Sequence, residues 1–208
     1  LRTALTEVAQ AAKSTYQGRL FAQDALQGLR LIDLCREVFD VVVMNPPYGD
    51  ASLAARDYLQ AKYGGQPNDL FGCCIERAIQ MGRYIGSLTS RTFLFFSSFE
   101  KLRVDYLFPK KRITTVADLG FGVLDGAMVE TCAMVLEPKS KDYVESIFIR
   151  LNESDEKAEK LAEVSASLMQ NRTPSQIFLF PQEIFEGLDG APMPYWVGNS
   201  ILNRIHNE

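Results

Sequence analysis

The sequence has very little of what metal and histidine chemistry require. Among its 208 residues there is one histidine, His206, and no two cysteines stand in C-x-x-C spacing. The cysteines lie in apolar stretches at Cys35, Cys73, Cys74 and Cys132. We therefore expect no metal site and no disulfide framework, and we interpret the cysteines as buried thiols of a cytoplasmic protein.

Long apolar runs and a surplus of basic charge are also missing. The purely apolar stretches are only a few residues long, which is too short for a helix that crosses a membrane. The sequence has 22 Lys+Arg against 26 Asp+Glu, so its formal charge is −4. This balance argues against a surface that binds phosphates everywhere, and we interpret the basic cluster Lys110–Arg112 as a solvated helix end.

What the sequence does contain is an alternation of strand and helix patterns. Phe39–Met44 (FDVVVM) is apolar and β-branched, which is typical of a strand covered on both faces. Asp69–Met81 has apolar residues at helical spacing behind a candidate N-cap, Asp69, and Ser97–Leu107 begins with a capping-box spacing. Further strands are predicted at Arg19–Ala22, Arg83–Leu88, Ile113–Leu119, Thr131–Leu136 and Tyr143–Leu151, and further helices at Ala51–Lys62 and Glu153–Met169. The alternation predicts an α/β fold with a largely parallel sheet.

Asn45, Pro46, Pro47 and Tyr48 follow the strand Phe39–Met44 directly. In an open parallel sheet, ligands bind at the carboxyl ends of the strands, so this turn is well placed for a site. The two prolines stiffen the backbone, and the Asn45 amide oxygen can join the Pro46 carbonyl in accepting hydrogen bonds from an NH2 group. Tyr48 offers a flat face on which a base can stack. The motif therefore predicts a site for a planar amine, and a tight turn without a ligand is the alternative.

The segment FDVVVMNPPYGD resembles the catalytic motif of S-adenosylmethionine-dependent adenine-N6 DNA methyltransferases. The likeness covers roughly Arg19–Leu136, through DLFGCCIERAIQ, GRYIGSLTSRTFLFFSSFEKLR and ITTVADLGFGVLDGAMVETCAMVLE. It is particularly close to large single-chain enzymes, the PglX-like methyltransferases of phage defence and the type IIG methyltransferases of restriction-modification. The resemblance implies a partial Rossmann-like class I methyltransferase sheet, mostly parallel with its last strand antiparallel. The family order is 3-2-1-4-5-7-6, and the first strands, 1 and 2, would be lacking here.

The resemblance also implies roles for individual residues. Asn45 and Pro46 would accept hydrogen bonds from the N6 amino group of an adenine flipped out of the duplex, with Pro47 completing the catalytic motif. Tyr48 would stack on that base. Leu124 stands where the family often has a phenylalanine that packs on the target base, so its contact is expected to be less specific.

The resemblance implies S-adenosylmethionine as the cofactor, but the family's Gly-rich donor-binding loop and ribose-binding acid are expected before Leu1. Asp24 matches the family's acid that binds the adenine amino group of this donor, and a helix-capping aspartate is an equal alternative. Asp118–Gly122 (DLGFG) follows a strand and looks like a donor-binding loop, with Glu137 as its ribose-binding acid. Because Val123–Glu130 is too short for the crossover helix that parallel strands need, we favour a connection between antiparallel strands.

The chain does not begin with Met, and we expect it to be part of a longer protein. Residues 1–150 are expected to be the C-terminal part of a methyltransferase catalytic domain. Residues 151–208 are expected to be a helical or irregular extension toward an absent target-recognition domain. Phe39–Met44 then becomes an apolar edge that self-associates or is covered by the N-terminal segment, Arg19–Ala22 is displaced, and the donor binds weakly or not at all.

The predicted function is methyl transfer from S-adenosylmethionine to the N6 amino group of a flipped adenine in double-stranded DNA. The full-length protein would do this in a restriction-modification or phage-defence system, without a membrane partner. Protein-glutamine N5-methyltransferases also use N-P-P-Y on this fold, and a degenerate fold that only binds a partner is a further alternative. The insert Ala51–Asn68 favours DNA, and the retention of Asn45 and Tyr48 speaks against a degenerate fold.

Overall fold

The computed structural model describes residues 16–126, 128–140 and 144–198, with side chains from residue 23 onward. The chain divides into two compact units, residues 1–39 and residues 40–208. The first unit contributes the helix α2 (Tyr16–Leu34). Among the described residues, none of the helices combines the length and the apolar character that a membrane span needs.

The second unit is built on one six-stranded sheet in the order β1-β2-β4-β3-β5-β6. Its elements are β1 (Phe39–Met44), α3 (Leu53–Lys62), α4 (Leu70–Met81), β2 (Gly82–Ser90), the 3₁₀ turns η2 (Arg91–Leu94) and η3 (Ser97–Phe99), the π-helix η4 (Leu102–Leu107), β3 (Lys111–Gly120), β4 (Thr131–Pro138), β5 (Glu145–Arg150), α5 (Lys157–Met169), β6 (Ile177–Pro181) and α6 (Gln182–Glu186).

Strand direction and order agree with the fold that the resemblance implied. β4 lies between β2 and β3 and runs antiparallel to both. β3 pairs in parallel with β5, and β6 runs antiparallel to β5. The order β1-β2-β4-β3 reproduces the 4-5-7-6 part of the family order, with β4 as the antiparallel last strand. The predicted α/β class is therefore confirmed, and β5 and β6 extend the sheet beyond it.

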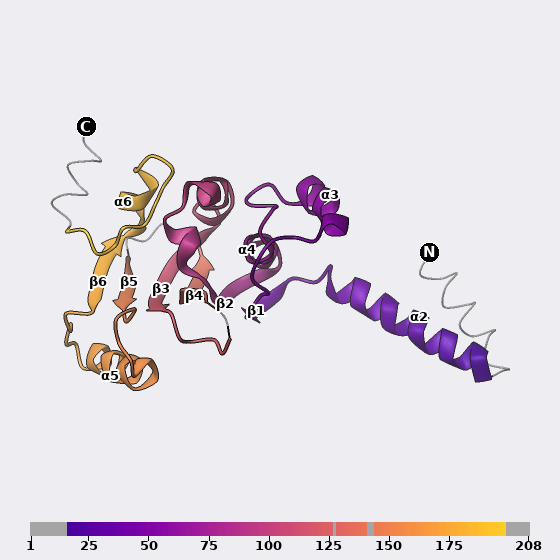
Figure 1. The fold of residues 1–208 in the computed structure, drawn as a ribbon, viewed down its shortest axis with the longest axis horizontal. Helices are drawn as coiled ribbons and strands as arrows, with labels where there is room; N and C mark the ends of the chain where they lie inside the picture. The colour runs from indigo at the N-terminus through magenta and orange to yellow at the C-terminus, as the bar shows by residue number, and fades with distance from the viewer. Residues whose placement is uncertain (1–15, 127, 141–143, 199–208) are drawn as a thin grey trace. The chain divides into compact units, whose positions relative to one another are not determined.

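Helices pack on both faces of the sheet. The larger hydrophobic cluster joins the sheet to α4, the η segments and α6, and its buried members include Ile75, Leu102 and Phe148. The smaller cluster packs Val164 of α5 against Ile149 of β5 and its neighbours. In Figure 1, α4 and α6 lie on one side of the strands and α5 lies on the other. The unit thus has the layered architecture that alternating strands and helices predict.

Most predicted elements are present, with their ends shifted by a few residues. In α4 the predicted N-cap is present: the Asp69 carboxylate accepts hydrogen bonds from the backbone N–H groups of Phe71 at 3.0 Å and Gly72 at 3.4 Å. Two local predictions are wrong. Arg19–Ala22 lies within α2, where backbone groups pair locally without the neighbour that a strand requires. Ser97 does not cap a helix, because the 3₁₀ turn η3 already begins at this residue.

β1 is an edge strand, as expected, but its two faces differ from the prediction of full coverage. Val42 is half-buried and packs against the larger cluster, whereas Val41 and Val43 on the other face are 59% and 80% exposed. In the part of the chain that the structure describes, this face therefore stays open. Self-association through the strand and its coverage by the N-terminal segment both stay predictions.

The segment after residue 150 contributes more than the expected helix. β6 extends the sheet, and Gln182 of α6 accepts a hydrogen bond from Ile113 N–H at 2.8 Å. The described residues of 151–198 belong to the same unit as the sheet, and the domain boundary at residue 150 stays a prediction.

The basic cluster Lys110–Arg112 is not a solvated helix end. Lys111 is buried in β3, and its ammonium donates to the carbonyl groups of Gly82 and Arg83.

Candidate active site

The motif Asn45–Tyr48 follows β1 directly and has no regular secondary structure. Its residues alternate in exposure: Pro46 is buried and fixes the turn to the unit, whereas Asn45 and Pro47 are exposed and Tyr48 is half-buried. Because each proline fixes its own φ, the turn has few alternative conformations. The amide of Asn45 and the ring of Tyr48 are thus held in place while remaining partly accessible.

The turn is anchored to the start of α4. Gly49 adopts a φ of +101°, which favours glycine, and its carbonyl accepts a hydrogen bond from Leu70 N–H at 3.1 Å. Ala51 N–H donates to the Asn68 carbonyl at 3.2 Å. The capped helix α4 therefore fixes the position of the motif, although the two lie about twenty residues apart in sequence.

Tyr48 is held at both ends of its side chain. Its hydroxyl donates to the Leu88 carbonyl of β2 at 3.2 Å and lies 3.4 Å from Asn45 Oδ1. Its ring lies 6.4 Å from that of Phe71, which stacks in turn on Phe99 at 5.1 Å. Burial raises the pKa of the Tyr48 phenol, and the nearby thiol of Cys132 adds to the effect, so the hydroxyl stays a donor at neutral pH. These contacts fix the ring as a platform.

Two cavities flank the motif. One, of about 560 Å³, is lined by Asn45 together with mainly apolar residues of five strands, β1 to β5, and of α5. The other, of about 330 Å³, lies beside Tyr48. Its further lining residues come from the residue after the motif, the start of α4, the end of β2, η2 and the connection between β3 and β4: Gly49, Asp69, Phe71, Ser90, Thr92, Phe121, Met128, Val129 and Glu130. The amide and the ring thus both face open space.

Leu124 is not among the residues that line the cavity beside Tyr48. The same connection brings Phe121 there instead, with its side chain 53% exposed. Phe121 is the aromatic residue of the DLGFG segment, which is a signal in the sequence for this position, but the family resemblance pointed to Leu124. The predicted contact between Leu124 and the target base stays a prediction.

The DLGFG segment forms the end of β3 and the start of its connection to the antiparallel strand β4, so it lies between antiparallel strands, as favoured from the sequence. Gly120 has a φ of +64°, and a Cβ there would lie 2.9 Å from the Cα of Asn152, so only glycine fits. Glu137 forms an ion pair with Arg112 at the opposite end of β4. Asp24 is an exposed residue within α2 and caps neither of its ends, and its contact with the methyl donor stays a prediction.

No group of three or more potential metal ligands occurs within the described ranges. The cysteines Cys73 and Cys132 are buried, and burial raises the pKa of their thiols to about 11 and about 12. Both thiols are therefore poor nucleophiles at neutral pH. The chemistry that the site can offer consists of positioning, hydrogen bonding and stacking.

Comparison with known proteins identifies the family of the chain. The family model described as "Eco57I restriction-modification methylase" matches residues 7–123, which is more than half of the chain and includes the motif Asn45–Tyr48. The chain belongs to this family.

Two curated relatives carry the family's activity in their names. The "adenine-specific methyltransferase BrxX" of Escherichia coli O9:H4 (strain HS) is 26% identical over 179 residues, which are 80% of this chain and 14% of that protein. The "adenine-specific methyltransferase PglX" of Lacticaseibacillus casei (strain Zhang) is 25% identical over 176 residues, with the same coverage of 80% and 14%. The chain thus spans about one seventh of the length of these relatives.

Solved structures share the fold. A chain of a type I restriction-modification system superposes with a TM-score of 0.57 at 20% identity, over 81% of this chain and 39% of that one. The methyltransferase subunit of a type I system from Streptococcus thermophilus gives 0.53 at 16% identity, over 72% and 36%. These likenesses support the arrangement of strands and helices described above.

Proposed function

We propose that the site, within the complete protein, holds an adenine flipped out of double-stranded DNA while its N6 amino group receives a methyl group. The observation that carries the proposal is the arrangement at the end of β1, where an exposed amide and an anchored aromatic ring face open cavities. Such a set suits a planar amine and supplies few donors for a phosphate. The names of the two relatives, both adenine-specific methyltransferases, support the choice of adenine.

Each residue of the motif has a distinct part in the proposed reaction. Asn45 Oδ1 and the Pro46 carbonyl accept hydrogen bonds from the amino group, which favours lone-pair character on N6. Tyr48 stacks on the base and offsets part of the few kcal/mol that base flipping costs. Pro47 stiffens the turn, and Leu124 or Phe121 packs on the free face of the base. Positioning and electrostatics then contribute most of the rate enhancement.

We propose S-adenosylmethionine as the methyl donor, which when bound supplies a methyl group activated by its sulfonium. The residues described here fit the acceptor side of such a reaction, because Asn45 is exposed at a cavity whose other walls are largely apolar. Asp24 is the proposed contact of the donor's adenine amino group. The proposed setting is a restriction-modification or phage-defence system.

A methylation assay with a matched pair of variants tests the proposal. The complete protein is incubated with unmethylated bacterial DNA and radiolabelled S-adenosylmethionine, and N6-methyladenine is identified by mass spectrometry. Asn45→Ala should lower the rate by about 10²- to 10³-fold, as is typical when one polar group that acts on the transition state is removed. Gln60→Ala, which removes another exposed carboxamide with one hydrogen bond, should change it less than about twofold.

Two outcomes would contradict the proposal. One is methylation of a glutamine-containing peptide, offered in parallel, in place of DNA. The other is equal activity of the Asn45→Ala and Gln60→Ala variants on DNA.

A further inference from the structure

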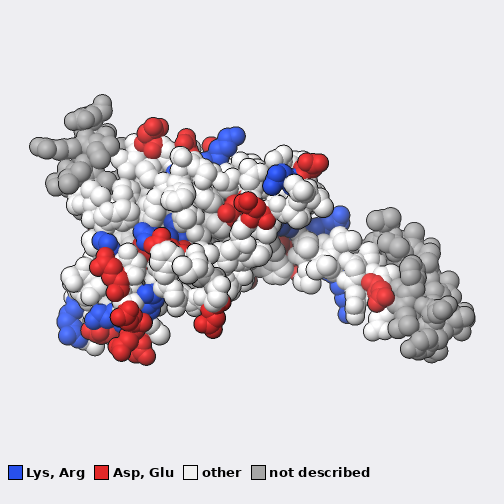
Figure 2. Space-filling view, viewed as in Figure 1, with Lys and Arg blue, Asp and Glu red and all other residues white. Residues whose placement is uncertain are grey.

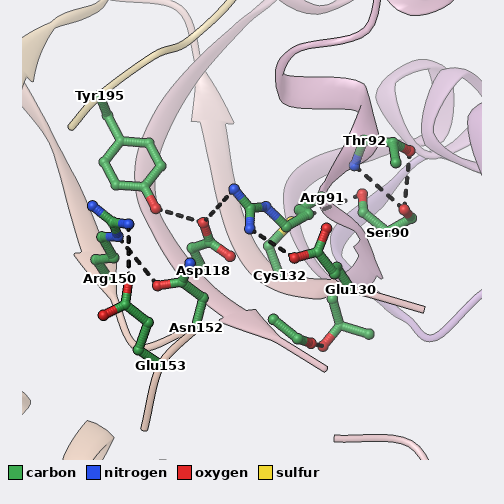
Figure 3. A network of polar contacts seen from close by, with 12 residues as sticks. Ser90, Arg91, Thr92, Asp118, Glu130, Cys132, Arg150, Asn152, Glu153 and Tyr195 are labelled. Carbon is green, nitrogen blue, oxygen red and sulfur yellow. Dashed lines mark hydrogen bonds and ion pairs between the residues drawn. The ribbon is translucent and has the colours of Figure 1, made fainter. Parts of the chain in front are cut away.

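A network of charged side chains lies directly behind the cavity beside Tyr48. At its centre is Asp118, at the end of β3, which is fully buried. Its Oδ2 accepts a hydrogen bond from the Tyr195 hydroxyl at 2.5 Å and lies 3.2 Å from Arg91 Nη2. Figure 3 shows these groups in a row, with Arg91 between Asp118 and Glu130. A fully buried carboxylate is costly unless it is paired, so this row is a specific arrangement.

Arg91 joins two parts of the chain that meet at the cavity. Its Nη1 donates to Glu130 Oε1 at 3.1 Å, and its backbone N–H donates to the Glu130 carbonyl at 3.0 Å. Glu130 ends the connection between β3 and β4, and it lines the cavity beside Tyr48 together with Phe121. The planar guanidinium can bind two carboxylates in fixed directions, which an ammonium group cannot do. Arg91 therefore fixes the end of the connection against the end of β3.

The C-terminal segment holds the same network from the other side. Tyr195 is fully buried and stacks on Phe148 at 5.0 Å while its hydroxyl reaches Asp118. The next residue, Trp196, packs edge-on against Phe95 at 5.0 Å, and the Arg91 guanidinium lies 5.1 Å from the centre of the Phe95 ring. Adjacent residues of this segment thus contact Asp118 and Phe95, which are two of the groups that contact Arg91.

The wall of the cavity needs such support. Phe121 and Met128 are 53% and 91% exposed, so the hydrophobic core does not hold them. The connection leaves β3 through a bulge beside Gly120, which breaks the regular pairing with β4. The contacts of Glu130 with Arg91 are therefore the specific restraint at the far end of the connection.

We infer that Arg91 is a positioning residue of the base pocket, and that Tyr195, acting through Asp118, couples the pocket wall to the C-terminal segment. The inference rests on the proposed function, because the wall matters only if a base enters the cavity. A displacement of the segment around Tyr195 therefore shifts Asp118 and Arg91, and with them Glu130. Because Glu130 lines the cavity, the wall that faces Tyr48 shifts as well.

The test compares two arginines in the complete protein. Arg91→Lys keeps the positive charge but replaces the two separate nitrogens that contact Asp118 and Glu130 with a single ammonium group, which lacks the fixed planar geometry. The control is Arg112→Lys, because Arg112 of β3 pairs with Glu137 of β4 at the end of these strands opposite the cavity. Its side chain is 12% exposed against 14% for Arg91. Arg91→Lys should lower kcat for methyl transfer to DNA about tenfold or more, with KM for DNA nearly unchanged, since misplacement of the wall affects the flipped base.

A second readout separates positioning from stability and needs no activity. Hydrogen exchange in the connection between β3 and β4 should accelerate in Arg91→Lys but not in Arg112→Lys, while β3 and β4 themselves stay equally protected. Tyr195→Phe removes one oxygen atom, keeps the stack on Phe148, and should give the same pattern with a smaller effect. In the double variant the two losses in kcat should not add, because both act through Asp118.

Equal kcat and equal exchange in the connection for Arg91→Lys and Arg112→Lys would overturn the inference, as would additive effects of Arg91→Lys and Tyr195→Phe. If the unaltered protein transfers no methyl group to DNA, the proposed function fails, and the exchange measurement alone decides whether Arg91 positions the connection.

Discussion

The two ends of strands β3 and β4 both bury charged side chains, but they use them differently. At one end, Lys111 donates to two carbonyl groups, and Gln182 bonds both Ile113 N–H and the Lys111 carbonyl. At the other end, Asp118 keeps one carboxylate oxygen, Oδ1, that is buried without a hydrogen-bond partner among the described residues. The connection that follows this end of β3 carries the exposed side chains of Phe121 and Met128, which line the cavity beside Tyr48.

The two ends therefore differ in what their buried polar groups do: at one end they stabilise the fold, and at the other they lie close to the candidate site. A buried charged group that is hydrogen-bonded to backbone carbonyl groups, as Lys111 is, stabilises one arrangement of the fold. A buried carboxylate with an incomplete set, next to a cavity, is held in place by the surrounding structure at a cost in stability. Figure 2 shows a related contrast at the surface, where charged residues of both signs gather over α5 while much of the remaining surface in that view is uncharged. We expect substitutions at the first end to change stability and those at the second to change activity.

Among the substitutions that test this difference, Tyr48→Ala is expected to have the largest effect on activity. Tyr48→Ala should lower kcat/KM for DNA methylation by about 10- to 100-fold, because stacking on an aromatic ring contributes about 1–3 kcal/mol per base. Tyr48→Phe keeps the ring but loses the hydrogen bond to the Leu88 carbonyl, so the loss should be only severalfold. Steady-state kinetics on DNA measures both.

Tyr58→Ala is the matched control for Tyr48→Ala. Tyr58 lies on α3 and is 63% exposed, so its removal deletes an aromatic ring that does not border the cavity beside Tyr48. Its activity should stay within about twofold of the unaltered protein. An equal loss in both alanine variants would show that the Tyr48 ring has no special role.

The sequence allowed the local parts of the site to be predicted but not the contacts between distant residues. The position of Asn45 at the end of a strand and the cap of α4 at Asp69 both follow from short patterns, and the structure has both. The hydrogen bond between Tyr195 and Asp118 joins residues 77 positions apart, and no periodic pattern signals such a pair. Phe121 was missed as a cavity residue because the bulge at Gly120 sets the course of the connection.

At the opposite end of the sheet, Lys111→Met should separate stability from activity. It leaves the carbonyl groups of Gly82 and Arg83 without their buried donor, so we expect a loss of about 2 kcal/mol in the free energy of opening of β3. Hydrogen exchange at the β3 amides measures this loss. The rate of methyl transfer should stay within about twofold.

Lys110→Met is the matched control, because the neighbouring lysine is exposed and lies 5.5 Å from the centre of the Tyr106 ring. It should cost less than about 0.5 kcal/mol. If Lys111→Met lowers the methylation rate as strongly as Tyr48→Ala does, the division between the two ends of the sheet is wrong.

The smallest effect concerns the pH dependence of stability through Asp118. Burial raises the pKa of this carboxyl above its ordinary value of 3.8, and Glu130 adds to the effect, while Tyr195 and Arg91 oppose it. Because the folded state binds this proton more tightly than the unfolded state, the contribution to stability is full below about pH 3.8 and is lost as the pH rises through the raised pKa. Relative to Asp118→Asn, the unaltered protein should therefore become more stable as the pH falls. Urea denaturation of both proteins from neutral to acidic pH measures the difference, with Asp57→Asn on α3 as the baseline for removing a carboxylate. If the difference in free energy of unfolding does not change with pH, the ionised Asp118 carboxylate does not destabilise the folded state. The contrast between the two ends of β3 and β4 would then depend only on the cavity beside Tyr48.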